Sequence, residues 1–271
     1  MKSSQRIWLT AGLSLLVLSG CDRKAETERG TDLPKTTAKA PDVSGEVDPR
    51  AVEALKKMSA YLMTLKTAAV TSNGSLDVVT EEGQRVQLDG IAKYKIRKPN
   101  GFMIDFVSNQ KERRFFYDGK NFTVYAPIQG FYAQVPAPGT NKETLAMIYD
   151  KFGLELPLED LFRWNEVGNE RADQLKSAFP IGTATIDGVL TNHFAFREGD
   201  ADWEVWIDAG DKPLPRKLVI IDRSDEARPT FTARLAWQEN PTFSDSDFTF
   251  KPDENAKRIQ MARYDLKGKV R

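Results

Sequence analysis

The chain has 271 residues, with 39 basic side chains, 39 acidic side chains and one histidine. Without an N-terminal segment that carries Lys2 and Arg6, the count becomes 37 basic against 39 acidic residues, a net charge of −2. This balance argues against a nucleic-acid binder, which needs a basic excess or stripe. Cys21 is the only cysteine, so an intramolecular disulfide is excluded and the fold must depend on an apolar core.

The N-terminus has three features of a bacterial lipoprotein export signal. Lys2 and Arg6 are basic, and residues 7–18 form an uncharged apolar run that is too short to span a bilayer as a helix. Leu18-Ser19-Gly20-Cys21 then resembles a lipobox. We therefore predict a signal peptide over 1–20 and a lipid anchor on Cys21, which is stable when two or more acyl chains are attached. The alternative is an ordinary signal peptide followed by a chance cysteine.

Residues 21–47 are polar and mixed in charge, so they are predicted to form a disordered tether after the lipidated cysteine. A flexible chain of this length has a reach of roughly 25–30 Å. Asp22 resembles a retention signal for the inner membrane, although the choice between inner and outer membrane stays open. The expected location is periplasm-facing and anchored to a cell membrane.

The folded part is predicted to begin with a helix over 49–66. Asp48 suits an N-cap, Pro49 suits the first helical position, and apolar residues follow at helical spacing. After Lys66 the apolar residues alternate with polar ones, as in 86–96 and 102–107. Turn-forming residues separate the runs, which is typical of an antiparallel meander of about six strands.

A second helical segment, 140–152, interrupts the sheet, and a shorter helix is expected after Pro157, through Phe162. Strands are then predicted at 180–187, 189–197, 202–208, 216–222 and 230–238. We expect a single α+β domain over 48–260 and a C-terminal tail over 261–271. With about 11 antiparallel strands, the sheet must curl to avoid exposed edges.

Several stretches of the folded part carry a family resemblance. They are Ala54–Leu62, Arg113–Lys120, Tyr132-Ala133 with Pro136–Gly139, Lys151–Leu158, His193–Arg197, Trp203–Ile207 and Pro213–Ile220. In these stretches the chain resembles the bacterial predicted periplasmic proteins known as domain of unknown function 2092. That family looks like the lipoprotein-carrier superfamily of LolA, LolB and RseB. The resemblance implies a strongly curved antiparallel half-barrel whose concave face is covered by helices and holds acyl chains, lipoproteins or partner proteins. The lipobox is a departure from the family, whose members resemble soluble periplasmic proteins.

Patterns typical of enzymes are mostly missing. His193 is the only histidine, and neither a zinc-protease motif, a paired-cysteine motif nor a glycine-rich phosphate loop occurs. The carboxylates of Asp202, Glu204 and Asp208 could perform acid–base chemistry beside Trp206, but polar residues on an outer sheet face are the simpler interpretation. We expect no catalysis, metal or cofactor, and we interpret His193 as a hydrogen-bonded structural residue.

Two arginines precede an aromatic run. Arg113 and Arg114 could hold a lipid head group or the acidic patch of a partner, and Arg216 with Lys217 raises the same question. The alternative for each is an outer-face side chain whose stem packs beside the core.

The density of aromatic residues is the feature that best indicates a ligand. A curved sheet with one such apolar face either packs a normal core under its helices or leaves a hollow that fits an acyl chain, in which each buried methylene is worth about 0.8 kcal/mol. The residues predicted to line this hollow are Phe102, Ile104, Phe106, Phe115, Tyr117, Phe122, Val124, Trp203, Val205 and Ile207.

The sequence therefore predicts a membrane-tethered, non-catalytic binding module. Its expected ligand is an acyl chain, a lipid or a lipoprotein, and no nucleic acid. The alternative is a protein-interaction or envelope-sensing module, similar to RseB, that binds a partner protein and no lipid.

Overall fold

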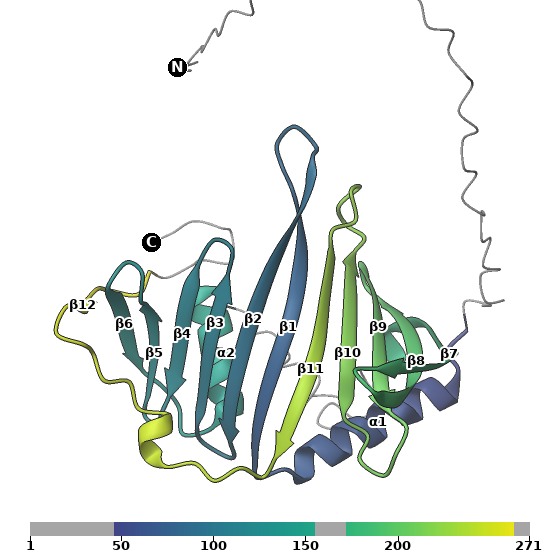
Figure 1. Cartoon of the computed structure of the whole chain (residues 1–271), viewed down its shortest axis with the longest axis horizontal. Helices are drawn as coiled ribbons and strands as arrows, with labels where there is room; N and C mark the ends of the chain where they lie inside the picture. Colours follow the sequence, from purple (N-terminus) through teal and green to yellow (C-terminus); the bar gives the residue numbers. More distant parts are fainter. Residues whose placement is uncertain (1–45, 155–171, 263–271) are drawn as a thin grey trace, which may run out of the picture. The chain divides into compact units, whose positions relative to one another are not determined.

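The computed structural model describes residues 46–154 and 172–262, which contain two α-helices and one large sheet (Figure 1). The predicted signal peptide, Cys21, almost all of the tether, the short helix expected after Pro157 and residues 263–271 lie outside the described residues. None of the described helices is long and apolar enough to cross a membrane.

The order of elements follows the predicted one closely. It runs α1 (Pro49–Thr64), β1 (Thr67–Val79), β2 (Arg85–Arg97), β3 (Phe102–Ser108), β4 (Glu112–Tyr117), β5 (Asn121–Ala126), β6 (Phe131–Pro136), α2 (Asn141–Phe152), β7 (Leu175–Ile186), β8 (Val189–Glu198), β9 (Ala201–Asp208), β10 (Pro215–Asp222), β11 (Thr230–Glu239) and β12 (Lys257–Arg258). The main difference is β7, which begins five residues before the predicted start at 180. Register shifts near Ser177 and Pro180 interrupt the alternation there, so the pattern hides the beginning of the strand.

All strands belong to one sheet with the order β12-β6-β5-β4-β3-β2-β1-β11-β10-β9-β8-β7. It consists of two antiparallel meanders, β1–β6 and β7–β11, joined where β1 pairs with β11. Only β12 pairs in parallel, with β6. The predicted class, an α+β fold with a strongly curved, open antiparallel sheet and two helices, is confirmed, with twelve strands instead of about eleven.

Local capping explains where the helices begin and end. The side chain of Asp48 accepts a hydrogen bond from the backbone N–H of Arg50 at 2.8 Å, and Pro49 opens α1, as predicted. At α2, the hydroxyl of Thr140 accepts from the backbone N–H of Glu143 at 3.2 Å. Gly153 ends that helix with a φ of 62°, a left-handed conformation that glycine adopts without strain.

Both helices pack against the same face of the sheet, which we call the concave face. Leu55, Met58 and Leu62 of α1 and Ile148 of α2 are fully buried in one core cluster with side chains from both meanders. In Figure 1, α2 lies behind β2 and β3, and α1 runs across the lower ends of the second meander. The helices therefore cover the end of the concave face at which β1 begins.

The opposite, convex face carries a segment that we call the strap, residues 241–258, which leads from β11 to β12. The ring of Phe250 packs against Phe116, Tyr125 and Tyr132, with centroids 5.4, 5.2 and 4.9 Å away. The strap ends by adding β12 to the edge strand β6. At the other edge of the sheet, Val47 forms a bridge with Ala178 of β7. Each exposed edge is thus partly covered by an end of the folded region, which limits pairing with other chains.

Candidate functional site

The strand register places all ten predicted hollow residues on the concave face. Phe102 lies opposite Tyr117, and Phe115 lies opposite Val124. On β9, Trp203, Val205 and Ile207 alternate with residues of the other face and so also point to the concave side. Six of the ten are buried and belong to the core beneath the helices: Phe102, Ile104, Tyr117, Phe122, Val205 and Ile207. The other four are half-buried at its border: Phe106, Phe115, Val124 and Trp203. The space directly under α1 is occupied by the side chains of α1 itself, such as Leu55.

A row of apolar side chains continues beyond this core, on the part of the concave face that the helices do not reach. Leu76 of β1 is 46% exposed and lies between Leu88 of β2 and Phe231 of β11. Phe231 in turn lies opposite Ile220 of β10, which is 37% exposed. We call Leu88, Leu76, Phe231 and Ile220 the open row. It crosses four neighbouring strands and joins the two meanders.

Two glycines lie beneath the aromatic rings next to the open row. Gly74 and Gly90 are paired across β1 and β2. A Cβ atom on Gly90 would lie 3.2 Å from Cε2 of Phe106, and one on Gly74 would lie 3.4 Å from Cε2 of Phe231 and 2.9 Å from the carbonyl oxygen of Thr232. Because glycine has no side chain, the rings of Phe106 and Phe231 can lie close to the backbone of the sheet. The concave face therefore presents aromatic surface next to the open row.

The two arginines of β4 point to opposite faces of the sheet. Arg114 is on the convex face and pairs with Asp105 at 3.3 Å and with Glu112 at 2.9 Å. Arg113 is on the concave face, directly opposite Phe106. Its Nη1 donates a hydrogen bond to the carbonyl oxygen of Glu112 at 2.6 Å and another to the side-chain oxygen of Gln129 at 3.1 Å. The structure therefore separates two residues for which the sequence analysis gave the same two interpretations.

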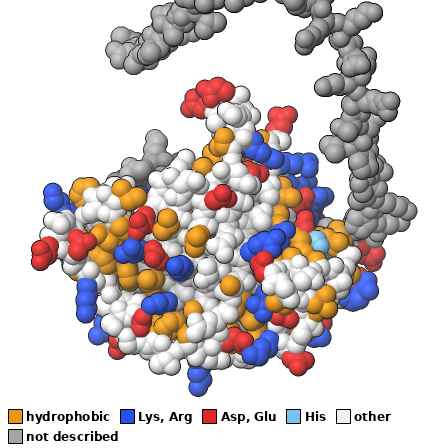
Figure 2. Space-filling model, viewed as in Figure 1, with side chains coloured by type: hydrophobic (Ala, Val, Ile, Leu, Met, Phe, Trp, Pro, Cys, Tyr) orange, Lys and Arg blue, Asp and Glu red, His pale blue; other side chains and the backbone are white. Residues whose placement is uncertain are grey.

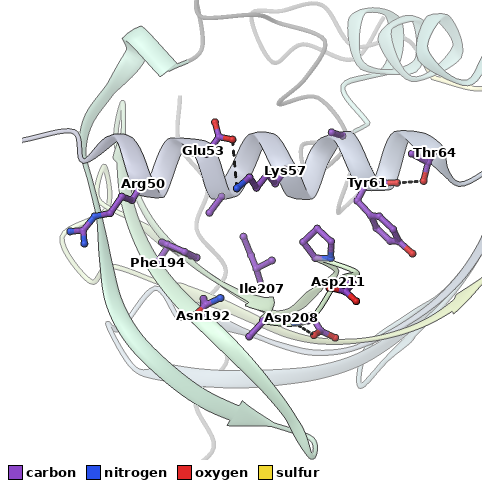
Figure 3. Close-up of a pocket in the computed structure, with 15 residues that line it drawn as sticks. Arg50, Glu53, Lys57, Tyr61, Thr64, Asn192, Phe194, Ile207, Asp208 and Asp211 are labelled. Carbon is purple, nitrogen blue, oxygen red and sulfur yellow. Dashed lines mark hydrogen bonds and ion pairs between the residues drawn. The ribbon is translucent and has the colours of Figure 1, made fainter.

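A groove of about 760 Å³ opens between α1 and the ends of β8 and β9 (Figure 3). Its floor includes Phe194 and Ile207, which rise from the strands toward the helix, and its wall on α1 includes Lys57 and Tyr61. This volume is in the range of small-molecule sites. Ile207 is the one predicted hollow residue that lines the groove. The mixed charge of its walls makes it a different environment from the open row.

Two residues that line the groove, Tyr61 and Asp208, are held by charged groups next to it. The hydroxyl of Tyr61 donates to the carboxylate of Glu239, which also accepts from Lys212 Nζ at 2.8 Å. The bonds from Lys212 and then from Tyr61 lower the pKa of Glu239, while burial and the neighbouring carboxylate raise the pKa of Tyr61. Asp208 is paired with Arg216 at 2.8 Å. Sequence reasoning missed the groove because its residues come from one face of a helix, from two distant strands and from the loop after β9.

The three carboxylates considered for catalysis do not form an acid–base pair. Asp202 is bound by Arg197 at 2.5 Å, and this bond lowers the pKa of Asp202. Glu204 is hydrogen-bonded to His193 at 2.7 Å, and Asp208 forms an ion pair with Arg216. Each carboxylate is therefore held by a separate partner. No cluster of three or more metal-ligating side chains occurs within residues 46–154 and 172–262.

His193 belongs to a packed group on the convex face. Its ring stacks on Trp206 with centroids 3.8 Å apart, and Lys217 Nζ lies 4.2 Å from the centroid of the Trp206 ring. With the bond to Glu204, these contacts agree with the interpretation of His193 as a structural residue. Figure 2 shows this side of the sheet, with basic and acidic side chains distributed among neutral ones.

Comparisons with known proteins give one family match and several distant structural likenesses. A comparison with curated proteins found no match. Among solved structures, an uncharacterized conserved protein from Thermus thermophilus is 12% identical, with a TM-score of 0.47, over 78% of this chain and 99% of its own. The lipoprotein LppX of Mycobacterium tuberculosis is 14% identical (TM-score 0.45; 72% and 98% covered). A LolA superfamily protein of Nitrosomonas europaea is 9% identical (TM-score 0.37; 74% and 97% covered).

The sequence itself gives a more definite result than these distant structural likenesses. The model of the family described as "Predicted periplasmic protein (DUF2092)" matches residues 51–262. The match includes α1 from Ala51 onward, α2 and every described strand of the sheet. The resemblance seen in the sequence is confirmed, and the chain belongs to this family of predicted periplasmic proteins.

Proposed function

We propose that this protein is a non-catalytic binding protein that holds the apolar chain of a lipid or lipoprotein on the uncovered part of its concave face. The observation that carries the proposal is the open row. Leu76 and Ile220 are large aliphatic side chains, 46% and 37% exposed, on the same face as the core. Contiguous apolar surface of this kind on a soluble domain is typical of a binding site.

The energy available on this face is sufficient for an acyl ligand. Burial of ten methylene groups would contribute about 8 kcal/mol before the cost of ordering the chain. The half-buried rings of Phe106 and Phe115 continue the apolar surface from the open row toward β4 and β5. A flexible ligand could therefore lie across several strands and cover side chains that are now in contact with water.

The proposed location brings the domain close to its ligand. Periplasmic export follows from the family, and a lipid anchor on Cys21 would keep the domain within the reach of its tether from the membrane. Asp22 leads us to propose the inner membrane for this anchor. The binding face would then be presented to lipids and lipoproteins at the membrane surface.

The test uses the exported chain with Cys21→Ser and with residues 1–20 replaced by an ordinary cleavable signal peptide, which removes the anchor but leaves the domain unchanged. Native mass spectrometry should detect co-purified lipid, and displacement of a fluorescent fatty acid should give an affinity. Leu76→Gln with Ile220→Gln should weaken binding about tenfold, since a loss of about 1.4 kcal/mol of apolar contact corresponds to that factor.

The matched control lies on the convex face. Ile91 and Val107 are 46% and 47% exposed and lie opposite each other across β2 and β3. Ile91→Gln with Val107→Gln makes a chemically similar change on the other side of the sheet and should leave binding unchanged. Absence of both bound lipid and fatty-acid displacement would refute the proposal, as would an equal loss in both double variants.

The groove between α1 and the ends of β8 and β9 favours a second candidate function, the binding of a partner protein. Its apolar floor and its walls of both charges suit a peptide segment better than an acyl chain. A purified envelope partner that still binds the Leu76→Gln/Ile220→Gln variant, but not a Lys57→Glu variant, would support this alternative. Loss of the partner only in the open-row variant would contradict it.

A further inference from the structure

We infer that Arg113 binds the anionic head group of the ligand, a carboxylate or a phosphate, while the ligand's chain lies on the apolar concave face. This inference rests on the proposed function and makes it more specific, because it selects amphiphiles with a negative head. Its basis is a single cation placed on the part of the concave face formed by β1–β6, where the other side chains are uncharged.

The register shows how unusual this position is. On the concave face of β1–β6, strands whose residues are all described, Arg113 is the only charged side chain. Its neighbours on that face are apolar: Phe106 lies opposite on β3, and Phe115 follows two residues along β4. Because Arg113 is half-buried among apolar groups, its charge is only partly solvated, and a counter-charge there would be favourable.

The hydrogen bonds of Arg113 leave one edge of its guanidinium available. Nη1 donates to the carbonyl oxygen of Glu112 and to the side chain of Gln129, which fixes the direction of the group. Within the described part of the chain, Nε and Nη2 have no hydrogen-bond partner, and no carboxylate lies within ion-pair distance of the group. An Nε–Nη2 edge is the geometry that binds a carboxylate or a phosphate through two parallel hydrogen bonds.

The neighbouring arginine shows that this arrangement is particular to the concave face. Arg114 bonds to the carboxylates of Asp105 and Glu112 through Nε and Nη2, the same atoms that are available in Arg113. The two residues share a strand and a side-chain type and differ in the face to which they point. Arg114 has its anions within the protein, whereas Arg113 would obtain one from a ligand.

The position of Arg113 also fits the path of a chain along the open row. Phe106, opposite Arg113, lies over Gly90, and four strand spacings separate β4 from Phe231 on β11. At the usual distance between strands this separation is about 19 Å. Phe231 also lies four residues, about 13 Å, along β11 from Leu235, which is level with Arg113, so the diagonal distance is about 23 Å and a long acyl chain crosses it when nearly extended. A ligand whose head is at Arg113 can therefore extend over the aromatic surface to the second meander.

The experiment compares three probes on the same Cys21→Ser chain. Palmitate has a carboxylate head, hexadecyl phosphate has a phosphate head, and hexadecanol has the same chain length without a charge. Arg113→Gln should weaken binding of the preferred anionic probe by about tenfold to a hundredfold, as expected for the loss of a charged hydrogen-bonding partner. Binding of hexadecanol should change less than about twofold, because its hydroxyl gains little from the charge. The relative affinities of the two anionic probes show whether the head is a carboxylate or a phosphate.

Two further variants control the interpretation. Arg114→Gln removes a charge from the same strand and should leave all three affinities unchanged, whereas Arg113→Lys should recover part of the anionic affinity without the paired geometry. Equal effects of Arg113→Gln on charged and uncharged probes, or no effect on any of them, would overturn the inference but leave the apolar binding face intact. If the parent protein bound none of the probes, the proposed function would fail as well.

Discussion

The strap on the convex face should be essential to stability, and Phe248→Ala tests this expectation. Phe248 is fully buried, although it follows a short 3₁₀ turn in a segment with little regular structure. Its ring makes an edge contact with Phe243 at 5.5 Å, and the guanidinium of Arg97 lies 4.5 Å from its centroid. Gly101 is so close that a Cβ there would lie 3.3 Å from the ring.

The expected loss follows from these contacts. Truncation of a fully buried phenylalanine to alanine costs about 3–5 kcal/mol, because transfer energy is lost and a cavity is left. The interaction between ring and guanidinium accounts for about 0.5–1 kcal/mol of this loss. The backbone of β2 and β3 is held by sheet pairing, and Gly101 is held by hydrogen bonds to the backbone of Arg97 and the side chain of Asn141, so neither can move to fill the space.

Urea unfolding of the two proteins, followed by tryptophan fluorescence, gives the difference in the free energy of unfolding. Ile259→Ala, just beyond the strap, is the control, because Ile259 is 50% exposed and its truncation should cost less than about 0.5 kcal/mol. A loss below about 1.5 kcal/mol for Phe248→Ala would refute the view that the strap is anchored by this ring.

Two further predictions concern charges and caps. Lys95 Nζ lies 2.6 Å from the carboxylate of Asp247, and its hydrogen bond, followed by those from Ser244, lowers the pKa of Asp247 from 3.8 to about 2. This contribution to stability is present above pH 4 and is lost as the pH falls toward 2. Asp247→Asn should therefore destabilise by less than about 1 kcal/mol at pH 7 and flatten the decline between pH 4 and 2, which acid titrations of unfolding would show. Asp48→Ala should cost about 1 kcal/mol by loss of the N-cap of α1, measurable by thermal unfolding, whereas an unchanged melting temperature would contradict this role.

The sequence was sufficient to predict the elements that local patterns determine. The Asp48-Pro49 pair begins α1, and Gly153 ends α2, because capping depends on residues within one turn. Alternation of apolar residues also identified the face of β3, β4 and β9, and hence which side chains share a surface. It could not determine how much of that surface is buried. Burial depends on the position of the helices, which long-range packing decides.

Other features were not visible in the sequence because they depend on pairing between distant segments. The strap and β12 have no alternating pattern, and the two residues of β12 become a strand only by pairing with β6. Likewise, the adjacent residues Arg113 and Arg114 both precede the aromatic run, and the same two interpretations were given for each. The parity of β4 alone could have placed Arg113 beside Phe115, but the partners that distinguish the two arginines come from other strands and turns.

The dimensions of the elements explain why part of the concave face is left to a ligand. The 16 residues of α1 and the 12 of α2 give helices about 24 and 18 Å long and about 10 Å wide. The twelve strands span about 53 Å along the sheet at the usual separation. Two such helices cover only a fraction of this surface, and a sheet that met only water beyond them would carry mostly polar residues there. The convex face does so with Lys93, Asp105 and Arg114, beside the exposed apolar pair Ile91 and Val107. The concave face instead carries Leu76, Phe231 and Ile220 beyond the helices, and an apolar ligand would satisfy that pattern.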